Sequence, residues 1–210
     1  TQYVLIGAGF DSFLCRRPAW AGGLQIYEVD HPATQQLKRQ QLKQCGIPES
    51  DAVHFVAADL SGETLQSALS RSSFQPTQPT FFSWLGVTVY LTREANLATL
   101  RAIASMAPAG SELVFTYVDE AVLRPGHANT EAFNKLRSDV SSVGESFLSG
   151  FDPATLKPLL LETGLLLLED LGGNQAVARY DAAGVHGLRW AGAGHLAHAR
   201  VVNPEQRSPA

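Results

Sequence analysis

Short apolar runs alternate with amphipathic stretches along the whole chain. The runs are four to six residues long and rich in β-branched and aromatic side chains, whereas the stretches between them carry apolar residues at helical spacing. This alternation is typical of an α/β fold built on a parallel sheet. The pattern predicts strands at Tyr3–Ile6, Gln25–Val29, His54–Ala58, Thr80–Leu85, Glu112–Tyr117, Leu165–Glu169 and Ala176–Tyr180.

Residues that start and stop helices stand between these strands. Thr92 and Asp152 are placed to cap helices, and Pro32 suits a first helical turn. In the helix that begins at Pro32, Leu37 faces inward and Lys38 faces water, on the spacing of its apolar residues. The predicted helices are Asp11–Arg16, Pro32–Cys45, Gly62–Arg71, Arg93–Met106, Thr130–Val140 and one that starts at Pro153.

The chain reads as one domain. Its 210 residues, 45% of them hydrophobic, are enough for one well-buried core and too few for two of ordinary size. No linker or repeat divides them, so we expect a single domain over residues 1–203 and a frayed tail over 204–210. The most apolar segment, residues 156–171, is interrupted by charges, which excludes a membrane span.

Charge and cysteine content narrow the possible partners. The formal net charge is −4 and there is no run of basic residues, which argues against nucleic acid or an acidic lipid surface as a partner. The two cysteines, Cys15 and Cys45, have no neighbours at metal-ligand spacing, and so few are typical of a reducing cytoplasm. We therefore expect a cytoplasmic protein without a metal site.

The stretch YVLIGAGFDS, residues 3–12, joins the first strand to a glycine bend. In open α/β sheets, ligands bind in the crevice at the carboxyl ends of the strands. Gly7, Ala8 and Gly9 form the bend, and the two glycines allow close approach of the backbone to a ligand because no Cβ intervenes. The stretch therefore predicts a site for a nucleotide-type cofactor.

Carboxylates follow the next two strands as well. Asp30 comes after the second strand, where it can accept hydrogen bonds from a ribose diol, and Asp59 comes after the third, where it can meet an adenine amine beside Leu60. A dinucleotide site usually has a third glycine, but Ser12 stands there, preceded by Asp11. An acid is unfavourable beside a pyrophosphate and favourable beside a cationic sulfonium. Asp11 thus favours S-adenosylmethionine over NAD.

With these residues in place, the chain resembles the class I S-adenosylmethionine-dependent methyltransferases, and more narrowly the leucine carboxyl methyltransferase family and its bacterial relatives. The segments that carry the resemblance are VLIGAGFDSFLCR, IYEVDHP, VAADL, FFSWLGVTVYLT and GFDPATLKPLLLETG. The resemblance implies a Rossmann-like seven-stranded sheet of order 3-2-1-4-5-7-6, with an antiparallel seventh strand. It also implies that Gly7 and Gly9 line the cofactor, that Asp30 holds its ribose, and that Asp59 and Leu60 meet the adenine.

The chain departs from the family's pattern in two places. Leu85 follows the fourth strand, where the carboxyl methyltransferases proper have an acid, which fits the bacterial branch better. Relatives also carry N-terminal lid helices over the cofactor, and the chain as given shows no counterpart ahead of its first strand.

The sequence gives fewer signals for the residues that contact the methyl acceptor than for those that bind the cofactor. Tyr90 and Tyr117 follow the fourth strand and end the fifth, so they are the candidate catalytic residues. No base is evident: His127, Arg124 and Glu145 lie in the irregular stretch, and the late His195 and its neighbours are expected in solvent. We expect an O-methyltransferase acting on a carboxylate or hydroxyl of a small molecule or peptide. An NAD-type oxidoreductase and a degenerate, non-catalytic cofactor-binding domain are the alternatives.

Overall fold

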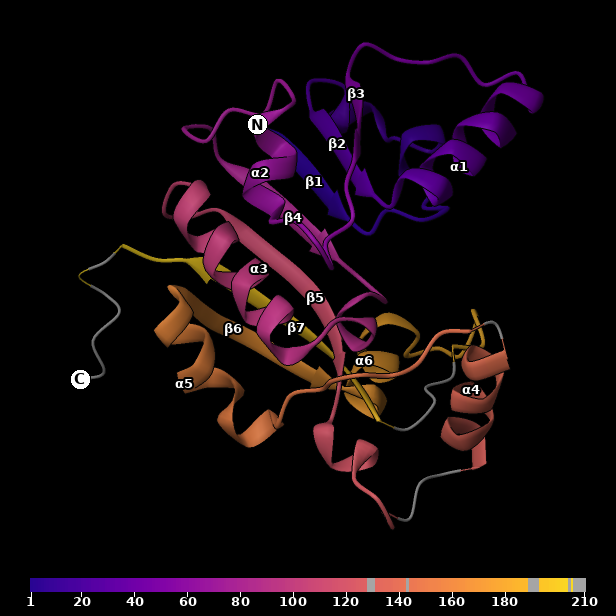
Figure 1. Cartoon of the computed structure of the whole chain (residues 1–210), viewed down its shortest axis with the longest axis vertical. Coiled ribbons are helices and arrows are strands. Elements are labelled where there is room, and N and C mark those ends of the chain that lie inside the picture. The colour runs from indigo at the N-terminus through magenta and orange to yellow at the C-terminus, as the bar shows by residue number, and fades with distance from the viewer. Residues whose placement is uncertain (128–130, 143, 189–192, 204, 206–210) are drawn as a thin grey trace.

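The computed structural model describes residues 1–127, 131–142, 144–188, 193–203 and 205. It shows a seven-stranded sheet of order β3-β2-β1-β4-β5-β7-β6 with helices on its faces (Figure 1). All neighbouring strands are parallel except β7, which runs antiparallel to both β5 and β6. The predicted order is confirmed. The strands are β1 Gln2–Ile6, β2 Gln25–Asp30, β3 Val53–Ala57, β4 Thr80–Trp84, β5 Glu112–Val118, β6 Leu165–Gly172 and β7 Gly194–Val201.

The predicted helix starts are confirmed where capping residues mark them. The hydroxyl of Thr92 accepts a hydrogen bond from the Ala95 amide, and the Asp152 carboxylate accepts one from Ala154. The helix predicted at residues 11–16 is only a 3₁₀ turn. The helices are α1 Pro32–Gln44, α2 Leu65–Ser70, α3 Arg93–Met106, α4 Glu131–Ser142, α5 Pro153–Thr163 and α6 Gly173–Tyr180, with 3₁₀ turns η1 Phe13–Cys15, η2 Ala19–Ala21, η3 Thr88–Tyr90 and η4 Glu120–Leu123.

The main core lies between the sheet and the helices α2, α3 and α5. Alternate residues of the central strands point into it, among them Phe82 and Trp84 of β4 and Phe115 of β5, all fully buried. Leu100 of α3 and Leu160 of α5 meet them from the helical side. Because both layers are closely packed here, the strands form a rigid base whose carboxyl ends are held in fixed positions.

The prediction of the seventh strand is wrong. The segment Ala176–Tyr180 belongs to helix α6, in which Ala176 is buried, and the seventh strand is Gly194–Val201. Small residues explain the error: β7 buries Ala197 and Ala199 at period two between β5 and β6, and these weak apolar signals are less conspicuous than the apolar residues of α6. Pairing with β5 and β6 therefore determines that this segment is a strand.

The predicted orientation of α1 is also wrong. Leu37 is 54% exposed, whereas Lys38 is only 4% exposed and places its Nζ 2.6 Å from Oε2 of the buried Glu28 on β2. A buried carboxylate needs a cationic partner, and Lys38 is the residue of α1 that reaches it. The ion pair therefore determines which side of the helix faces the sheet.

Two further points concern the extent of the chain. In the part that the structure describes, no helix combines the length and apolar character needed to span a lipid bilayer. The predicted tail, residues 204–210, lies outside the described residues apart from Glu205. The extent of the domain stays a prediction.

Candidate functional site

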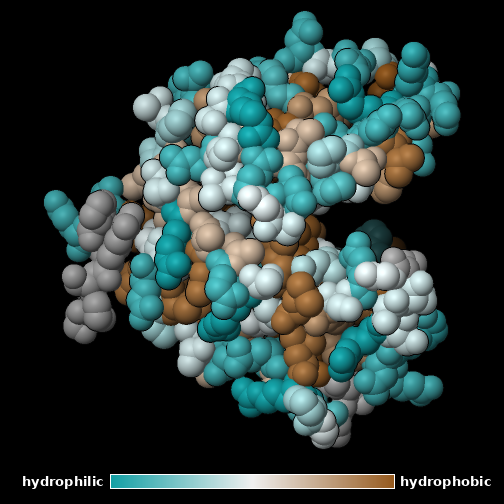
Figure 2. Space-filling view, viewed as in Figure 1, coloured by the Kyte–Doolittle hydropathy of each residue, from teal (hydrophilic) through white to brown (hydrophobic). Residues whose placement is uncertain are grey.

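A notch opens at the edge of the molecule between the part formed by α1 and the part formed by α4 (Figure 2). The strands β1, β2 and β4 point their carboxyl ends toward this side of the molecule in the same view (Figure 1). Crevices at this end of a parallel sheet are the usual ligand sites of α/β folds. The residues that follow each strand are therefore the ones to consider as a site.

The glycine loop, residues 7–9, lies directly after β1. Gly7 and Gly9 both have positive φ, of 68° and 45°, which only glycine adopts easily. The amides of Gly7 and Ala8 donate to the carbonyl of Val29, at 2.8 and 3.2 Å. A Cβ added at Gly9 would meet nothing within 4 Å. The loop is therefore anchored to β2 on one side and open on the other.

Asp30, at the end of β2, is held by backbone amides. Its Oδ2 accepts a hydrogen bond from the Gly9 amide, and its Oδ1 accepts one from the His31 amide at 2.6 Å. Each oxygen keeps a second lone pair, so a ligand can still bind through both. The glycine loop thus fixes the direction in which this half-buried carboxylate points.

Asp59 and Asp11 extend the row of carboxylates at this edge. The Ala58 amide donates to the Asp30 carbonyl at 2.8 Å, which joins the end of β3 to the end of β2. Asp59 is exposed, and hydrogen bonds from the Ser61 hydroxyl and amide lower its pKa. Oδ1 of Asp11 accepts from the Phe13 amide at 2.6 Å. The structure therefore places all three predicted carboxylates after adjacent strands, and Leu60 packs beside Asp59 against the main core.

The charges of Asp11 and Asp30 both act on Glu28, a carboxylate buried in β2. The pKa of Glu28 is raised by its burial, opposed by Lys38, and raised further by the charges of Asp11 and Asp30. Both aspartates are therefore close enough to affect the same buried carboxyl. Asp11 and Asp30 together make the potential negative at the carboxyl ends of β1 and β2, and a negative potential favours a cationic ligand.

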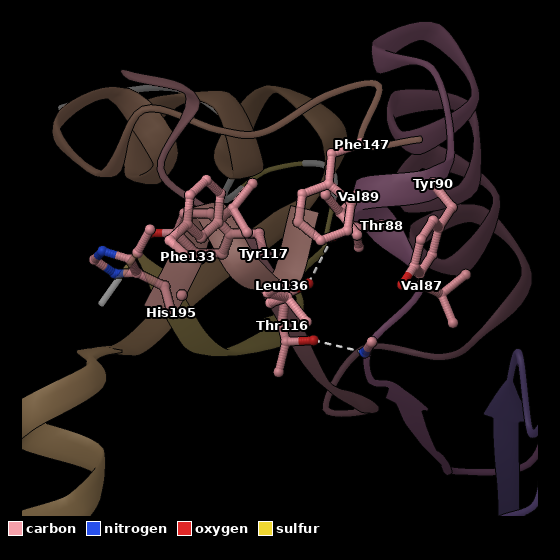
Figure 3. Close-up of a pocket in the computed structure, with 14 residues that line it drawn as sticks. Val87, Thr88, Val89, Tyr90, Thr116, Tyr117, Phe133, Leu136, Phe147 and His195 are labelled. Atoms are coloured by element: carbon pink, nitrogen blue, oxygen red, sulfur yellow. Dashed lines mark hydrogen bonds between the residues drawn. The ribbon is translucent and has the colours of Figure 1, made fainter. Parts of the chain in front are cut away.

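A second hollow lies beyond the carboxyl ends of β4 and β5 (Figure 3), and we name it the acceptor cavity for the role that the sequence leads us to expect. It has a volume of about 250 Å³, is partly open to solvent, and has mainly apolar walls. The side chains that line it include Val87, Val89, Tyr90, Phe133, Leu136 and Phe147. A cavity of this kind, with few polar groups, is typical of a small-molecule site.

Val87 connects the acceptor cavity to the glycine loop. It lines the cavity, and a Cβ added at Gly7 would overlap its Cγ2 methyl group. Because Gly7 has no Cβ, the Val87 side chain can occupy this space. Val87 therefore contacts the glycine loop and also forms part of the wall of the cavity. A ligand above the loop and a ligand in the cavity would consequently lie next to each other.

Hydroxyl groups are the main polar features of the acceptor cavity. Oγ1 of Thr116 accepts from the Gly86 amide at 2.7 Å, and Oγ1 of Thr88 donates to the Thr116 carbonyl at 2.7 Å (Figure 3). Tyr90 is half-buried and points its hydroxyl toward Val87 (Figure 3). Burial raises the pKa of Tyr90, and the charge of Glu145 raises it further. The Tyr90 hydroxyl is therefore protonated and able to donate at neutral pH.

Tyr117, the other candidate, has a different environment. Its ring is buried, and its hydroxyl donates to Oδ2 of Asp170 at 2.7 Å. Burial and then this bond raise its pKa. Nδ1 of His195 lies 3.1 Å from Oδ1 of the same carboxylate, and its ring stacks on Tyr117 at 4.8 Å. These three side chains form a network at the junction of β5, β6 and β7, so Asp170 determines where the Tyr117 hydroxyl points.

Sequence reasoning missed Asp170 and misplaced His195. The prediction that His195 is solvated is wrong, because its side chain is only 20% exposed. The error follows from the misplaced seventh strand: without β7 beside β5, nothing brings His195 to Tyr117. The signal that could have found it is the alternation of His195, Ala197 and Ala199, which marks a strand.

The remaining candidates lie at the surface. Arg124 is exposed and pairs with Glu120 at 3.3 Å, and His127 is exposed in the following loop. Glu145 is exposed and near enough to Tyr90 to affect its pKa. Leu85, which directly follows β4 at the position where the carboxyl methyltransferases proper were expected to carry an acid, is 47% exposed.

Comparison with known proteins identifies the chain's relatives. Residues 1–104 match the family model described as leucine carboxyl methyltransferase. Through this segment, the chain belongs to the leucine carboxyl methyltransferase family. The matched segment includes the glycine loop and the three carboxylates, and it ends within α3. The predicted family is thereby confirmed, and the match covers four of the five segments that carried the resemblance; residues 150–164 lie beyond it.

Two bacterial proteins are similar over a larger part of the chain. YktD of Bacillus subtilis, whose name places it among the S-adenosyl-L-methionine-dependent methyltransferases, is 38% identical over 170 residues, which are 81% of this chain and 55% of YktD. A protein of Mycolicibacterium vanbaalenii with the same kind of name is 31% identical over 151 residues, which are 71% of this chain and 48% of that protein. The chain spans about half the length of these curated relatives.

Solved structures share the fold at low sequence identity. The mitomycin 7-O-methyltransferase MmcR matches 96% of this chain and 49% of its own, with a TM-score of 0.59 at 15% identity. An O-methyltransferase family protein from Burkholderia thailandensis gives 0.60 at 11%, over 97% and 51% of the two chains. The magnesium protoporphyrin IX methyltransferase ChlM of Synechocystis, solved with bound SAH, gives 0.55 at 16%, over 95% and 74%. These likenesses show the methyltransferase fold for this family member.

Proposed function

We propose that the chain binds S-adenosylmethionine above the glycine loop and transfers its methyl group to an oxygen atom of an acceptor in the adjacent cavity. The acceptor carries a carboxylate or a hydroxyl group and is a small molecule or a peptide. The observation that carries the proposal is the position of Val87, which lines the acceptor cavity and touches the glycine loop at Gly7. Methyl transfer requires donor and acceptor to be neighbours, and this wall makes them so.

The residues of the first three strand ends suit the cofactor chemically. Asp30 presents two oriented oxygens of the kind that a ribose diol requires. Asp59 makes both of its hydrogen bonds to Ser61 through Oδ1, so Oδ2 is available for an adenine amine. Asp11 offers negative charge near the methionine end, and Gly7, Ala8, Gly9 and Leu60 provide the surface against which the cofactor lies. The names of the relatives, and the SAH bound to ChlM, support the same cofactor.

S-adenosylmethionine supplies an activated methyl group when bound, so the protein's task is to position the acceptor. Holding an acceptor oxygen in line with the methyl group can contribute several of the ~7–11 kcal/mol available to well-oriented reactions. Tyr90 is the candidate for direct contact, since its protonated hydroxyl points toward Val87. Tyr117 contributes to the wall of the cavity, because its hydroxyl already donates to Asp170. A carboxylate acceptor needs no base, whereas a hydroxyl usually does.

The sheet favours this proposal over an oxidoreductase. The usual dinucleotide-binding sheet has the order 3-2-1-4-5-6. Here an antiparallel β7 stands between β5 and β6, as in the methyltransferase order expected from the sequence. No feature of the described residues favours NAD, so S-adenosylmethionine is the one cofactor that we propose.

The test is a titration of the chain with S-adenosylhomocysteine by isothermal calorimetry. We expect one site, and an affinity weakened by about 100- to 10,000-fold in Asp30→Ala, because two hydrogen bonds to a charged group, each worth about 1.5–3 kcal/mol, are lost. Asp30→Asn keeps one oxygen acceptor and should lie between the two. The exposed Asp51, which precedes β3, provides the control Asp51→Ala with unchanged affinity. A chain that is folded by circular dichroism and gives no heat with S-adenosylhomocysteine would contradict the proposal.

A further inference from the structure

The polar side chains that line the acceptor cavity include Tyr90, Thr116 and His195, and most of the other lining side chains are apolar. Thr116 is bonded to Gly86 and retains its own hydroxyl proton for donation, and the Tyr90 hydroxyl points to Val87 (Figure 3). Phe133 and Phe147, which carry no polar side-chain atom, supply the apolar surface. An acceptor that fits this arrangement directs one oxygen-bearing group to the cofactor and has a mainly apolar body.

The apolar surface is formed largely by aromatic rings in mutual contact. Phe147 packs against Tyr90 with ring centroids 5.7 Å apart and planes at 69°, and against Phe133 at 6.0 Å and 47°. Aromatic pairs in offset or edge-on geometry are stabilised beyond what their buried area contributes. A further ring placed among these three would make such contacts, whereas an aliphatic body would gain only the buried area.

Size limits the number of rings. An apolar protein cavity of about 150 Å³ accommodates one benzene molecule. The acceptor cavity, at about 250 Å³, therefore has room for one ring with substituents, and because it is partly open to solvent, the rest of a larger acceptor would lie outside it. The described residues that line it include no lysine, arginine, aspartate or glutamate, and the lining His195 already has its Nδ1 bonded to Asp170. The lining therefore favours an uncharged body of the acceptor.

On the basis of the proposed function, we infer that the acceptor is a small molecule with a single aromatic ring, whose carboxyl or hydroxyl group points to the glycine loop. Thr116 and Tyr90 donate hydrogen bonds to that group, and Phe133 and Phe147 contact the ring. These four side chains set the specificity of the cavity. The inference excludes peptides and fused-ring compounds as the preferred acceptors.

Three matched probes test the inference. They are 4-hydroxybenzoate, 4-hydroxycyclohexanecarboxylate and 6-hydroxy-2-naphthoate, which carry the same two groups on one aromatic ring, one saturated ring and two fused rings. Binding is measured by ligand-observed NMR on the chain saturated with S-adenosylhomocysteine. We expect 4-hydroxybenzoate to bind about fivefold more tightly than the saturated ring, as about 1 kcal/mol of aromatic contact implies. Equal affinity for the saturated ring, or tighter binding of the naphthoate, overturns the inference.

Two variants place the binding in the acceptor cavity. Ala193→Phe fills the cavity from its buried Ala193 and should reduce the affinity for 4-hydroxybenzoate more than tenfold, whereas Ala178→Phe, on the exposed side of α6, should not change it. Phe147→Leu keeps an apolar wall and should abolish the preference for the aromatic ring over the saturated one. This second variant keeps the test valid if Ala193→Phe fails to fold. An unchanged preference in Phe147→Leu overturns the inference.

The same preparations separate this inference from the proposed function. If S-adenosylhomocysteine binds and 4-hydroxybenzoate shows no preference over the saturated ring, the ring inference is refuted and the methyltransferase proposal stands. If 4-hydroxybenzoate binds in the cavity and S-adenosylhomocysteine does not bind, the cavity is an aromatic-binding site and the proposed reaction is refuted.

Discussion

Replacing Gly7 with alanine tests the contact on which the proposed site depends. The new Cβ meets two obstacles in this structure. Gly7 has φ of 68°, a conformation that residues with a Cβ adopt only under strain, and the Cβ would overlap Cγ2 of Val87. Gly9 offers a matched control, because its φ is also positive, at 45°, but a Cβ there would meet nothing within 4 Å.

The magnitude follows from adding the two effects. Left-handed backbone strain costs about 1–2 kcal/mol for a residue with a Cβ. Forcing an extra methyl group into a packed contact costs about 1–3 kcal/mol. We therefore expect Gly7→Ala to reduce the free energy of unfolding by about 2–5 kcal/mol and Gly9→Ala by about 1–2 kcal/mol. Domains usually have about 5–15 kcal/mol of stability, so a domain above about 5 kcal/mol remains folded after either change.

A double-mutant cycle with Val87→Ala isolates the contact. Urea unfolding followed by circular dichroism gives the free energy for wild type, Gly7→Ala, Val87→Ala and the double variant. Removing the Val87 methyl groups should relieve the overlap but not the backbone strain, so we expect a coupling free energy of about 1–3 kcal/mol. Additive effects within about 0.5 kcal/mol, or equal losses for Gly7→Ala and Gly9→Ala, would refute a shared wall between loop and cavity.

Two further predictions concern charge. The hydrogen bond from Arg200 lowers the pKa of Glu112, so the stability from this contact is present above the unfolded pKa of about 4.3 and is lost as the pH falls through the folded pKa. The free energy of unfolding in urea should therefore fall less between about pH 5 and pH 3 for Glu112→Gln than for wild type. Equal pH dependence in the two proteins would exclude the contact. Lys38→Met leaves Glu28 buried without its cation and should lower the free energy of unfolding by about 3–5 kcal/mol at neutral pH. Because Glu28 already has a raised pKa, this loss should shrink as the pH falls and Glu28 binds a proton, and a loss independent of pH would count against the buried charge.

Local signals predicted most of the fold correctly. The caps at Thr92 and Asp152 act within three residues of themselves, so the sequence around them is sufficient to place α3 and α5. The first five strands are apolar runs bounded by turn residues, and their predicted positions agree with the structure to within a residue or two. The glycine loop with Asp30 was found for the same reason, because each lies directly after a strong strand.

Features that depend on distant partners were not predictable from local pattern. Lys38 looks like a surface residue until Glu28, ten residues earlier on a neighbouring strand, is known to be buried. Asp170 and His195 are 25 residues apart and meet only because β6 and β7 pair. The acceptor cavity combines η3, β5, α4 and the start of β7, so no single stretch of sequence marks it.

The antiparallel direction of β7 has a consequence for how this scaffold can diversify. A parallel strand would bring its last residue to the working edge of the sheet, but β7 brings its first, Gly194, beside Val118, with Ala193 just before it. The residues proposed to bind the methyl donor lie before residue 61, and most of those proposed to bind the acceptor lie after residue 85. Under the proposed function, substitutions after residue 85 can change the acceptor preference while the residues before 61 keep the donor.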